Sequence, residues 1–343
     1  MTLPYPPSYL ARVLDSVDRL PGPNWLAYLV FALGLILVHA AIKWRDGAYP
    51  PGAFYPMHVA FMAAGPYYLA LIHYLDGAAA RALGAFRPAL DLPEPELPLV
   101  RYRLTTLPAR PVLWVTWFAV LYAGFLLFMV YRWVPLRPAA LAFTSVLSTG
   151  FEATVFVLVT LLFALFVYHT IHQLRVANWL YTAHTRISLF DLTPLYAFSR
   201  LAASTSIGWI LIAYARGGAA PDLTEVMVAG DLLATGLGLV IFLWPLLGIH
   251  RLLVEKKNHA KAVVGRLLEE TLDELHRRVA AGRFEEAAPV DQAVAGLKQE
   301  LELLDKIPTW PWQPETFRGV VTALLLPILL GLINRLLERW VGF

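Results

Sequence analysis

The sequence predicts an all-α integral membrane protein with about seven transmembrane helices and a cytosolic α-helical hairpin between the sixth and the seventh. Hydrophobic residues make up 58% of the 343 residues and charged residues only 15%. A soluble domain has roughly 45–50% apolar and about 25% charged residues. The apolar residues also occur in separate runs, several of which reach the roughly 20 residues that a helix needs to cross the hydrocarbon core. We therefore expect the chain to reside in a membrane.

The N-terminal segment precedes the first apolar run and has a different pattern. It lacks a basic segment followed by an apolar one, so no cleaved signal peptide is predicted. Residues 8–20 would place Leu10, Val13, Leu14 and Val17 on one side of a helix. This pattern is typical of a short amphipathic helix that lies on the membrane surface. A frayed surface helix is the alternative that the same residues allow.

Seven apolar runs are predicted to be transmembrane helices. Asn24 is a suitable N-cap for the first run, Pro66 should kink the second, and Pro327 interrupts the last. Arg200 falls within the first two turns of the fifth run, so its side chain must reach the interface or find a partner. The predicted spans comprise residues 25–42, 54–75, 111–131, 151–172, 195–215, 226–249 and 317–337.

The longest polar segment, between the sixth and seventh spans, predicts a pair of helices. Apolar residues recur at helical spacing on one face over residues 250–281 and again over 291–306. Gly282 is a suitable C-cap between them, and Pro289 or Asp291 lies near the start of the second helix. The chain thus divides into a six-span region with its N-terminal interfacial helix (1–249), a cytosolic hairpin (250–315) and a last span (316–343).

The basic residues are unevenly distributed over the predicted loops. The N-terminus and the segments 76–110, 173–200 and 250–318 together hold 21 of the 28 Lys and Arg. Without the hairpin and Arg318 the difference is still ten against seven. Because basic loops stay in the cytosol, we expect the N-terminus and the hairpin inside and the C-terminus outside. The expected location is a prokaryotic cytoplasmic membrane.

Several kinds of chemistry lack their usual sequence signals. The chain has no cysteine, which excludes disulfides, thiolate metal sites and cysteine nucleophiles. It also contains none of the common nucleotide-binding, serine-hydrolase or zinc-hydrolase motifs. Enzymatic activity stays uncertain, with the balance against it, and we expect no catalytic residue, no cofactor and no nucleic-acid partner.

Two acidic residues fall within predicted spans, where an ionisable group is costly. Asp231 lies about five residues into the sixth span. It is a candidate ion or proton site, although a charge that reaches the interface and pairs with Arg216 is the simpler interpretation. Glu152 is the second residue of the fourth span, where a carboxylate favours the helix macrodipole, so we interpret it as structural.

The histidines give only a weak metal signal. His169 and His172 are three residues apart and share a helix face, but a metal site needs at least a third ligand. Hydrogen bonding at the end of a span is the favoured interpretation, and no metal is predicted. His39, His58 and His73 are isolated in the sequence and are expected to be packing residues.

The segment IPTWPWQPE connects the predicted hairpin to the last span. Trp310 and Trp312 could simply anchor the chain at the headgroups, which is the favoured interpretation. The same stiff connection could instead transmit hairpin movement to the last helix, where Pro327 and Gly331 provide a weak point. These four residues are therefore candidates for a gating linker.

Of three functions that fit this plan, an oligomeric ion channel is preferred. The apolar stripe of the hairpin has too little partner surface within two helices, so it could contact neighbouring subunits. The alternatives are a non-catalytic scaffold or sensor that binds a cytosolic protein through the hairpin, and a carrier or lipid-handling protein. The expected partners are the lipid bilayer and further copies of the chain, and the scaffold or sensor alternative adds a cytosolic protein. In a channel the last helix would line the pore with Val321, Leu324, Leu325, Ile328 and Leu332.

The predicted topology is similar to that of the insect odorant and gustatory receptor channels. The shared features are seven spans, an inside N-terminus, a cytosolic helical layer before the last helix and an outside C-terminus. The resemblance implies a channel function. It is one of topology alone, and since no family motif is matched residue by residue, it assigns no site residue.

Overall fold

The computed structural model describes residues 3–133, 145–185, 189–218, 225–313 and 315–325. This part of the chain is almost entirely helical and contains no β-strand, which confirms the all-α prediction.

Four helical stretches are long and apolar enough to cross a membrane, which is consistent with membrane residence. A fifth results if two pieces of α8 (Glu225–Ala280), bent by 41° between Trp244 and Leu246, form one span. The count of seven therefore stays a prediction. The four are α2 (Asn24–Arg45), Ala109–Met129 of α5 (Ala109–Trp133), Val146–Thr182 of α6 (Val146–Ala183), and Thr193–Ile212, which includes much of α7 (Tyr196–Gly218).

Helix α3 (Pro56–Phe86) contains the predicted second span but is not among the four. It extends well past the predicted end at Leu75 and packs against α2, α6 and α7. Many of its side chains are buried, including Met62 and Tyr68, which are 0% exposed. A helix enclosed by protein can carry polar side chains at positions that lipid would not tolerate. Its lower hydropathy thus reflects its central position.

The N-terminal segment forms a helix, as the sequence predicted. In α1 (Tyr9–Asp18), the Ser8 Oγ caps the first turn by accepting a hydrogen bond from the Ala11 amide at 3.3 Å. Upstream of it, the Tyr5 hydroxyl donates to the Thr106 carbonyl at 2.7 Å. Burial, and secondarily the neighbouring Tyr102, raise the pKa of Tyr5 to about 12, so this phenol stays neutral and can donate.

Two predicted helix starts are wrong. Pro23 rather than Asn24 occupies the N-cap of α2, and the Asn24 side chain instead donates to Asp18 at 2.6 Å. Helix α9 (Phe284–Lys306) begins before Pro289, because Glu285 and Glu286 in its first turn stabilise the helix N-terminus. The predicted surface connection 76–110 is also largely helical. It continues α3 and adds η1 (Arg87–Ala89), η2 (Glu94–Glu96) and α4 (Leu97–Thr105).

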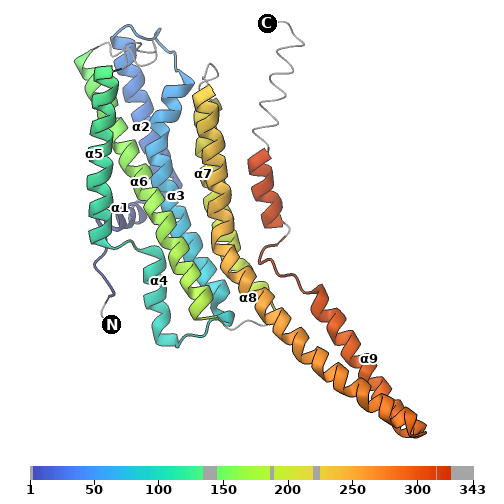
Figure 1. Ribbon diagram of the computed structural model, residues 1–343. Helices are drawn as coiled ribbons and strands as arrows, with labels where there is room; N and C mark the ends of the chain where they lie inside the picture. The colour runs from blue at the N-terminus through green and yellow to red at the C-terminus, as the bar shows by residue number, and fades with distance from the viewer. Residues whose placement is uncertain (1–2, 134–144, 186–188, 219–224, 314, 326–343) are drawn as a thin grey trace, which may run out of the picture.

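The bundle has two distinct ends (Figure 1). Helices α1 and α4 lie at one end, here named the α1 end, and α8 extends beyond the bundle on the same side.

Helix α9 returns along the outer half of α8, where the Lys257 Nζ donates to the carbonyls of Asp305 and Ile307, each at 2.9 Å. Gly282, with φ of 69°, provides the left-handed residue in the turn between them. A helical segment over residues 315–325 follows.

Candidate functional site

A stack of aromatic rings joins α8 to the helical segment 315–325. The ring of His250 lies parallel to Trp310 at a centroid distance of 4.0 Å, and Trp310 stacks on Trp312 at 4.5 Å. Trp312 in turn stacks on Phe317 at 5.2 Å and on Phe242 at 5.8 Å. Pro308 and Pro311 lie in the connecting segment, and their rings restrict the backbone there.

The stack contacts α8 on both sides of its bend. Phe242 belongs to the piece Gly236–Trp244 and His250 to the piece Leu246–Ala280. The His250 Nδ1 is also 3.0 Å from the Thr309 carbonyl oxygen, which holds the histidine ring over the linker. A change in the bend of α8 would therefore act directly on the rings that precede the last helix. Of the four predicted linker residues, Trp310 and Trp312 are in this stack, whereas Pro327 and Gly331 lie outside the described residues.

Three of the five predicted pore-lining residues lie in the described helical segment 315–325. Val321 and Leu324 are half-buried and Leu325 is exposed, whereas Ile328 and Leu332 lie outside the described residues. The candidate Asp231 falls within α8, but its side chain is not among those described.

A second group of polar residues is buried at the end of the bundle opposite α1. The His39 Nε2 is 3.0 Å from the Glu152 Oε1, and the Lys43 Nζ is 2.6 Å from the same oxygen. His58 stacks on His39 at 5.0 Å, and its Nδ1 is hydrogen-bonded to the Tyr49 hydroxyl. The interpretations of Glu152 as a macrodipole residue and of His39 and His58 as isolated packing residues are incomplete, because three helices bring these side chains together.

This buried group, defined as His39, Lys43, Tyr49, His58 and Glu152, could hold a cation. The ligand atoms of His39, His58 and Glu152 lie within 4.8 Å of one another, the one such set among the described residues. The Lys43 ammonium already neutralises the carboxylate in this structure. The arrangement is therefore an ion pair supported by two imidazoles, and a metal would have to compete with Lys43 for the same oxygen.

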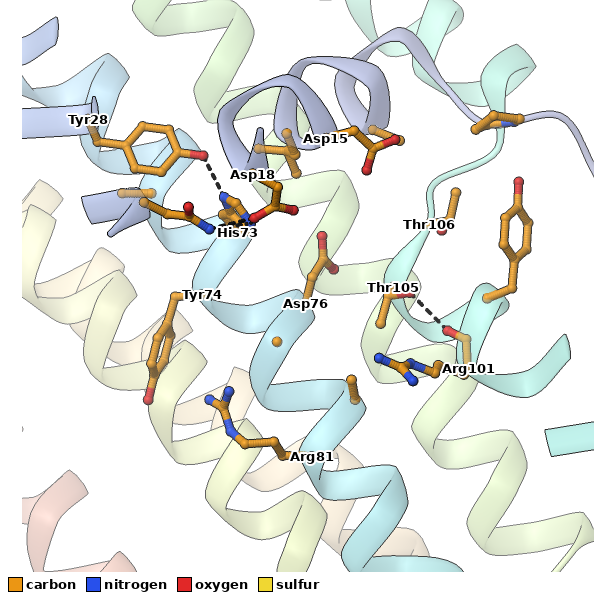
Figure 2. Close-up of a pocket in the computed structure, with 18 of the residues that line it drawn as sticks. Asp15, Asp18, Tyr28, His73, Tyr74, Asp76, Arg81, Arg101, Thr105 and Thr106 are labelled. Atoms are coloured by element: carbon orange, nitrogen blue, oxygen red, sulfur yellow. Dashed lines mark hydrogen bonds and ion pairs between the residues drawn. The ribbon is translucent and has the colours of Figure 1, made fainter. Parts of the chain in front are cut away.

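The α1 end of the bundle contains a polar pocket with a volume of about 910 Å³ (Figure 2). Three carboxylates line it, those of Asp15, Asp18 and Asp76, and two guanidinium groups, those of Arg81 and Arg101. Figure 2 shows the carboxylates on the side of α1 and the guanidinium groups on the side away from it. The pocket thus offers separated negative and positive groups to an occupant.

Hydrogen bonds fix the wall of this pocket. His73 connects three elements through its Nδ1, 2.8 Å from the Tyr28 hydroxyl, and its Nε2, 3.1 Å from the Asp18 carboxylate. The Asn24 amide donates to the same carboxylate. The interpretation of His73 as an isolated packing residue is also incomplete, since this ring ties α1 to α2 and α3.

His169 and His172, the weak metal candidates, have separate partners. The His169 Nε2 is 2.8 Å from Asp76, to which Gln173 also donates at 3.1 Å. The His172 Nε2 is 2.8 Å from the Arg103 carbonyl oxygen. The two rings therefore do not converge on one point.

The sequence analysis missed the buried group around Glu152 and the contacts of Asp76 with His169 and Gln173, because their members come from different helices. The available signal was local: His39 and Lys43 are four residues apart, and so are His169 and Gln173, which places each pair on one helix face. Such a face within an apolar helix indicates protein neighbours.

Comparison with known proteins gives no assignment. No protein-family model, no curated protein and no solved structure matches the chain.

Proposed function

We propose that the chain is an oligomeric ion channel of the cytoplasmic membrane. In this proposal the last helix lines the pore, and the helices α8 and α9 form a cytosolic hairpin that holds the subunits together. The N-terminus lies inside and the C-terminus outside, with seven spans in each subunit.

The aromatic stack is the observation that carries the proposal. It forms a continuous contact from both pieces of α8, through Trp310 and Trp312, to Phe317 at the beginning of the last helix. A channel whose gate is the last helix needs such a connection, because motion in the soluble part must reach the pore. Each ring pair contributes about 0.5–1.5 kcal/mol beyond its burial, so in this proposal the rings stay in contact and move together with α8.

Exposed apolar side chains on α8 and α9 favour an oligomer. Val263 and Leu267 are one turn apart on α8 and are 40% and 47% exposed. Leu303 on α9 is also exposed, although this helix pair lies beyond the bundle. Apolar surface of this kind is typical of protein interfaces. Neighbouring copies would cover it without any additional component.

The position of the charged segments favours a cytosolic location for this end. Helices α1 and α4 and the α8–α9 pair lie on one side of the bundle, and the sequence concentrates its Lys and Arg there. Such an excess is typical of the cytosolic side.

Ion flux through the purified full-length chain in liposomes tests the proposal. Trp312→Ala removes the centre of the stack and should change the flux about tenfold or more, because at least two ring contacts are lost. Trp114→Ala is the matched control, since Trp114 on α5 is 76% exposed and lies far from the linker in sequence. This control should conduct like the wild type.

Two results would overturn the channel. One is a stable monomer in detergent and in nanodiscs, which leaves no axis for a pore between subunits. The other is an oligomer that shows no flux over a range of voltage and pH. A monomer that captures a cytosolic protein through Val263 and Leu267 would instead support the scaffold or sensor function, which the same exposed side chains allow.

A further inference from the structure

A second cleft, with a volume of about 530 Å³, opens between α3, α7 and the helical segment 315–325. Arg81 of α3 and Arg200 of α7 both line it. Its other walls are mostly small or apolar, including Ala78, Leu201 and Ile207. The cleft is thus lined by two cationic side chains and by a mostly apolar surface.

The two guanidinium groups lack an anionic partner among the described residues. Neither Arg81 nor Arg200 has an ion pair or side-chain hydrogen bond there, in contrast to Arg87 and Arg278, which pair with glutamates. Glu315 lines the same cleft, yet it forms no ion pair with either arginine. The cleft therefore has one positive charge in excess, and two cations on facing helices repel each other until an anion lies between them.

The cleft lies at the boundary between the apolar and polar parts of the bundle. Arg200 is in the second turn of α7, within the apolar stretch Thr193–Ile212. Arg81 is near the end of α3 at the α1 end of the bundle. Ile207 lies about two turns deeper along α7 than Arg200. An occupant would thus meet cations at its outer end and an apolar wall at its inner end.

We propose that this cleft binds an anionic phospholipid. The phosphate lies between Arg81 and Arg200, whose guanidinium groups each offer several N–H donors suited to phosphate oxygens. One acyl chain runs inward along the small and apolar side chains of α3 and α7. Basic pockets between transmembrane helices at this level are suited to lipid headgroups. The site stands independently of the channel, since it depends only on the cleft and its charges.

Lipid binding to the delipidated, purified full-length chain tests the proposal. The measurement is native mass spectrometry with phosphatidylglycerol or phosphatidylcholine added at equal concentration. The wild type should retain phosphatidylglycerol, and the double variant Arg81→Gln/Arg200→Gln should retain it about tenfold less or weaker still, because two charge-assisted hydrogen-bonding groups are lost. The variant Arg81→Lys/Arg200→Lys keeps the charges and should bind more lipid than the glutamine variant.

A matched control separates this site from general attraction to an anionic surface. Arg132 is an exposed arginine near the opposite end of the bundle, on α5. Arg132→Gln should bind phosphatidylglycerol like the wild type. Far-UV circular dichroism shows whether each variant keeps its helix content.

Three outcomes would overturn the lipid assignment. The first is equal binding of phosphatidylglycerol by the wild type and the double glutamine variant, and the second is equal retention of phosphatidylcholine. The third is displacement of the lipid by glycerol phosphate at the same concentration, which would assign the cleft to a soluble phosphate compound. None of these readouts depends on ion flux, so failure here is distinguishable from failure of the channel.

Discussion

Ion pairs occur in two very different regions of this molecule. In the bundle, the side chains of Lys43 and Glu152 are 2% and 9% exposed, and His39 contacts the same carboxylate oxygen as Lys43. In the α8–α9 pair, Lys261 and Asp305 are 34% and 60% exposed. The same two chemical groups, an ammonium and a carboxylate, are therefore held in an enclosed site and in an open one.

Burial, more than the pairing itself, determines how strongly the loss of one partner of each ion pair affects stability. An exposed pair contributes little, because water solvates both charges when they separate. A buried pair also contributes little net stability, yet the loss of one partner leaves a charge that water cannot reach. We therefore expect the bundle to be sensitive to single charge changes and the α8–α9 pair to tolerate them.

The largest expected effect follows from Glu152→Gln. This change leaves the Lys43 ammonium buried without its counter-charge, and should lower the free energy of unfolding by about 3–5 kcal/mol. Unfolding of the full-length chain in a denaturing-detergent titration, followed by tryptophan fluorescence, measures the loss.

A double variant sharpens this result. Lys43→Met combined with Glu152→Gln removes both charges, and should recover most of the stability because no uncompensated charge remains. If the double variant is no more stable than Glu152→Gln alone, the loss comes from packing and the comparison between buried and open pairs fails.

Two glycines provide the next test, since one is enclosed and the other is open. A Cβ on Gly208 would lie 2.7 Å from the side chain of the buried Leu71, so Gly208→Ala should destabilise the bundle by about 1–3 kcal/mol. Gly296 on α9 has no atom within 4 Å of an added Cβ, so Gly296→Ala should stabilise by about 0.5–1 kcal/mol. Opposite shifts of the thermal midpoint are expected, and shifts of the same sign would contradict the packing described.

The smallest expected effect concerns pH and the open pair. The hydrogen bond from Lys261 holds the pKa of Asp305 below its ordinary value of 3.8. The contribution of the Lys261–Asp305 pair to stability is thus fully present above pH 3.8, and it is lost as the pH falls through the lowered pKa of Asp305. The difference in thermal midpoint between the wild type and Asp305→Asn should be small at neutral pH and should vanish in acid. A difference that grows in acid would reverse the sign of the linkage.

Much of the helical plan could be predicted from the sequence, because it depends on local patterns. The apolar run around 25–42 became α2, and the amphipathic segment with Leu10 and Leu14 on its apolar side became α1. The start of α9 was missed because a proline is tolerated early in a helix with a favourable acidic first turn. Helix α3 is not apolar enough to be recognised as a span from its composition. It can carry polar residues because neighbouring helices enclose them.

Hydropathy and helical spacing are properties of neighbouring residues, so the sequence alone is sufficient to predict a helical chain that is apolar enough for a membrane. Which polar groups meet depends instead on how the helices pack in the folded chain. Glu152 and His39 are 113 positions apart, and Arg81 and Arg200 come from different helices on the two sides of one cleft. Such groups become sites through the packing of whole helices, and their energies depend on the burial that this packing creates.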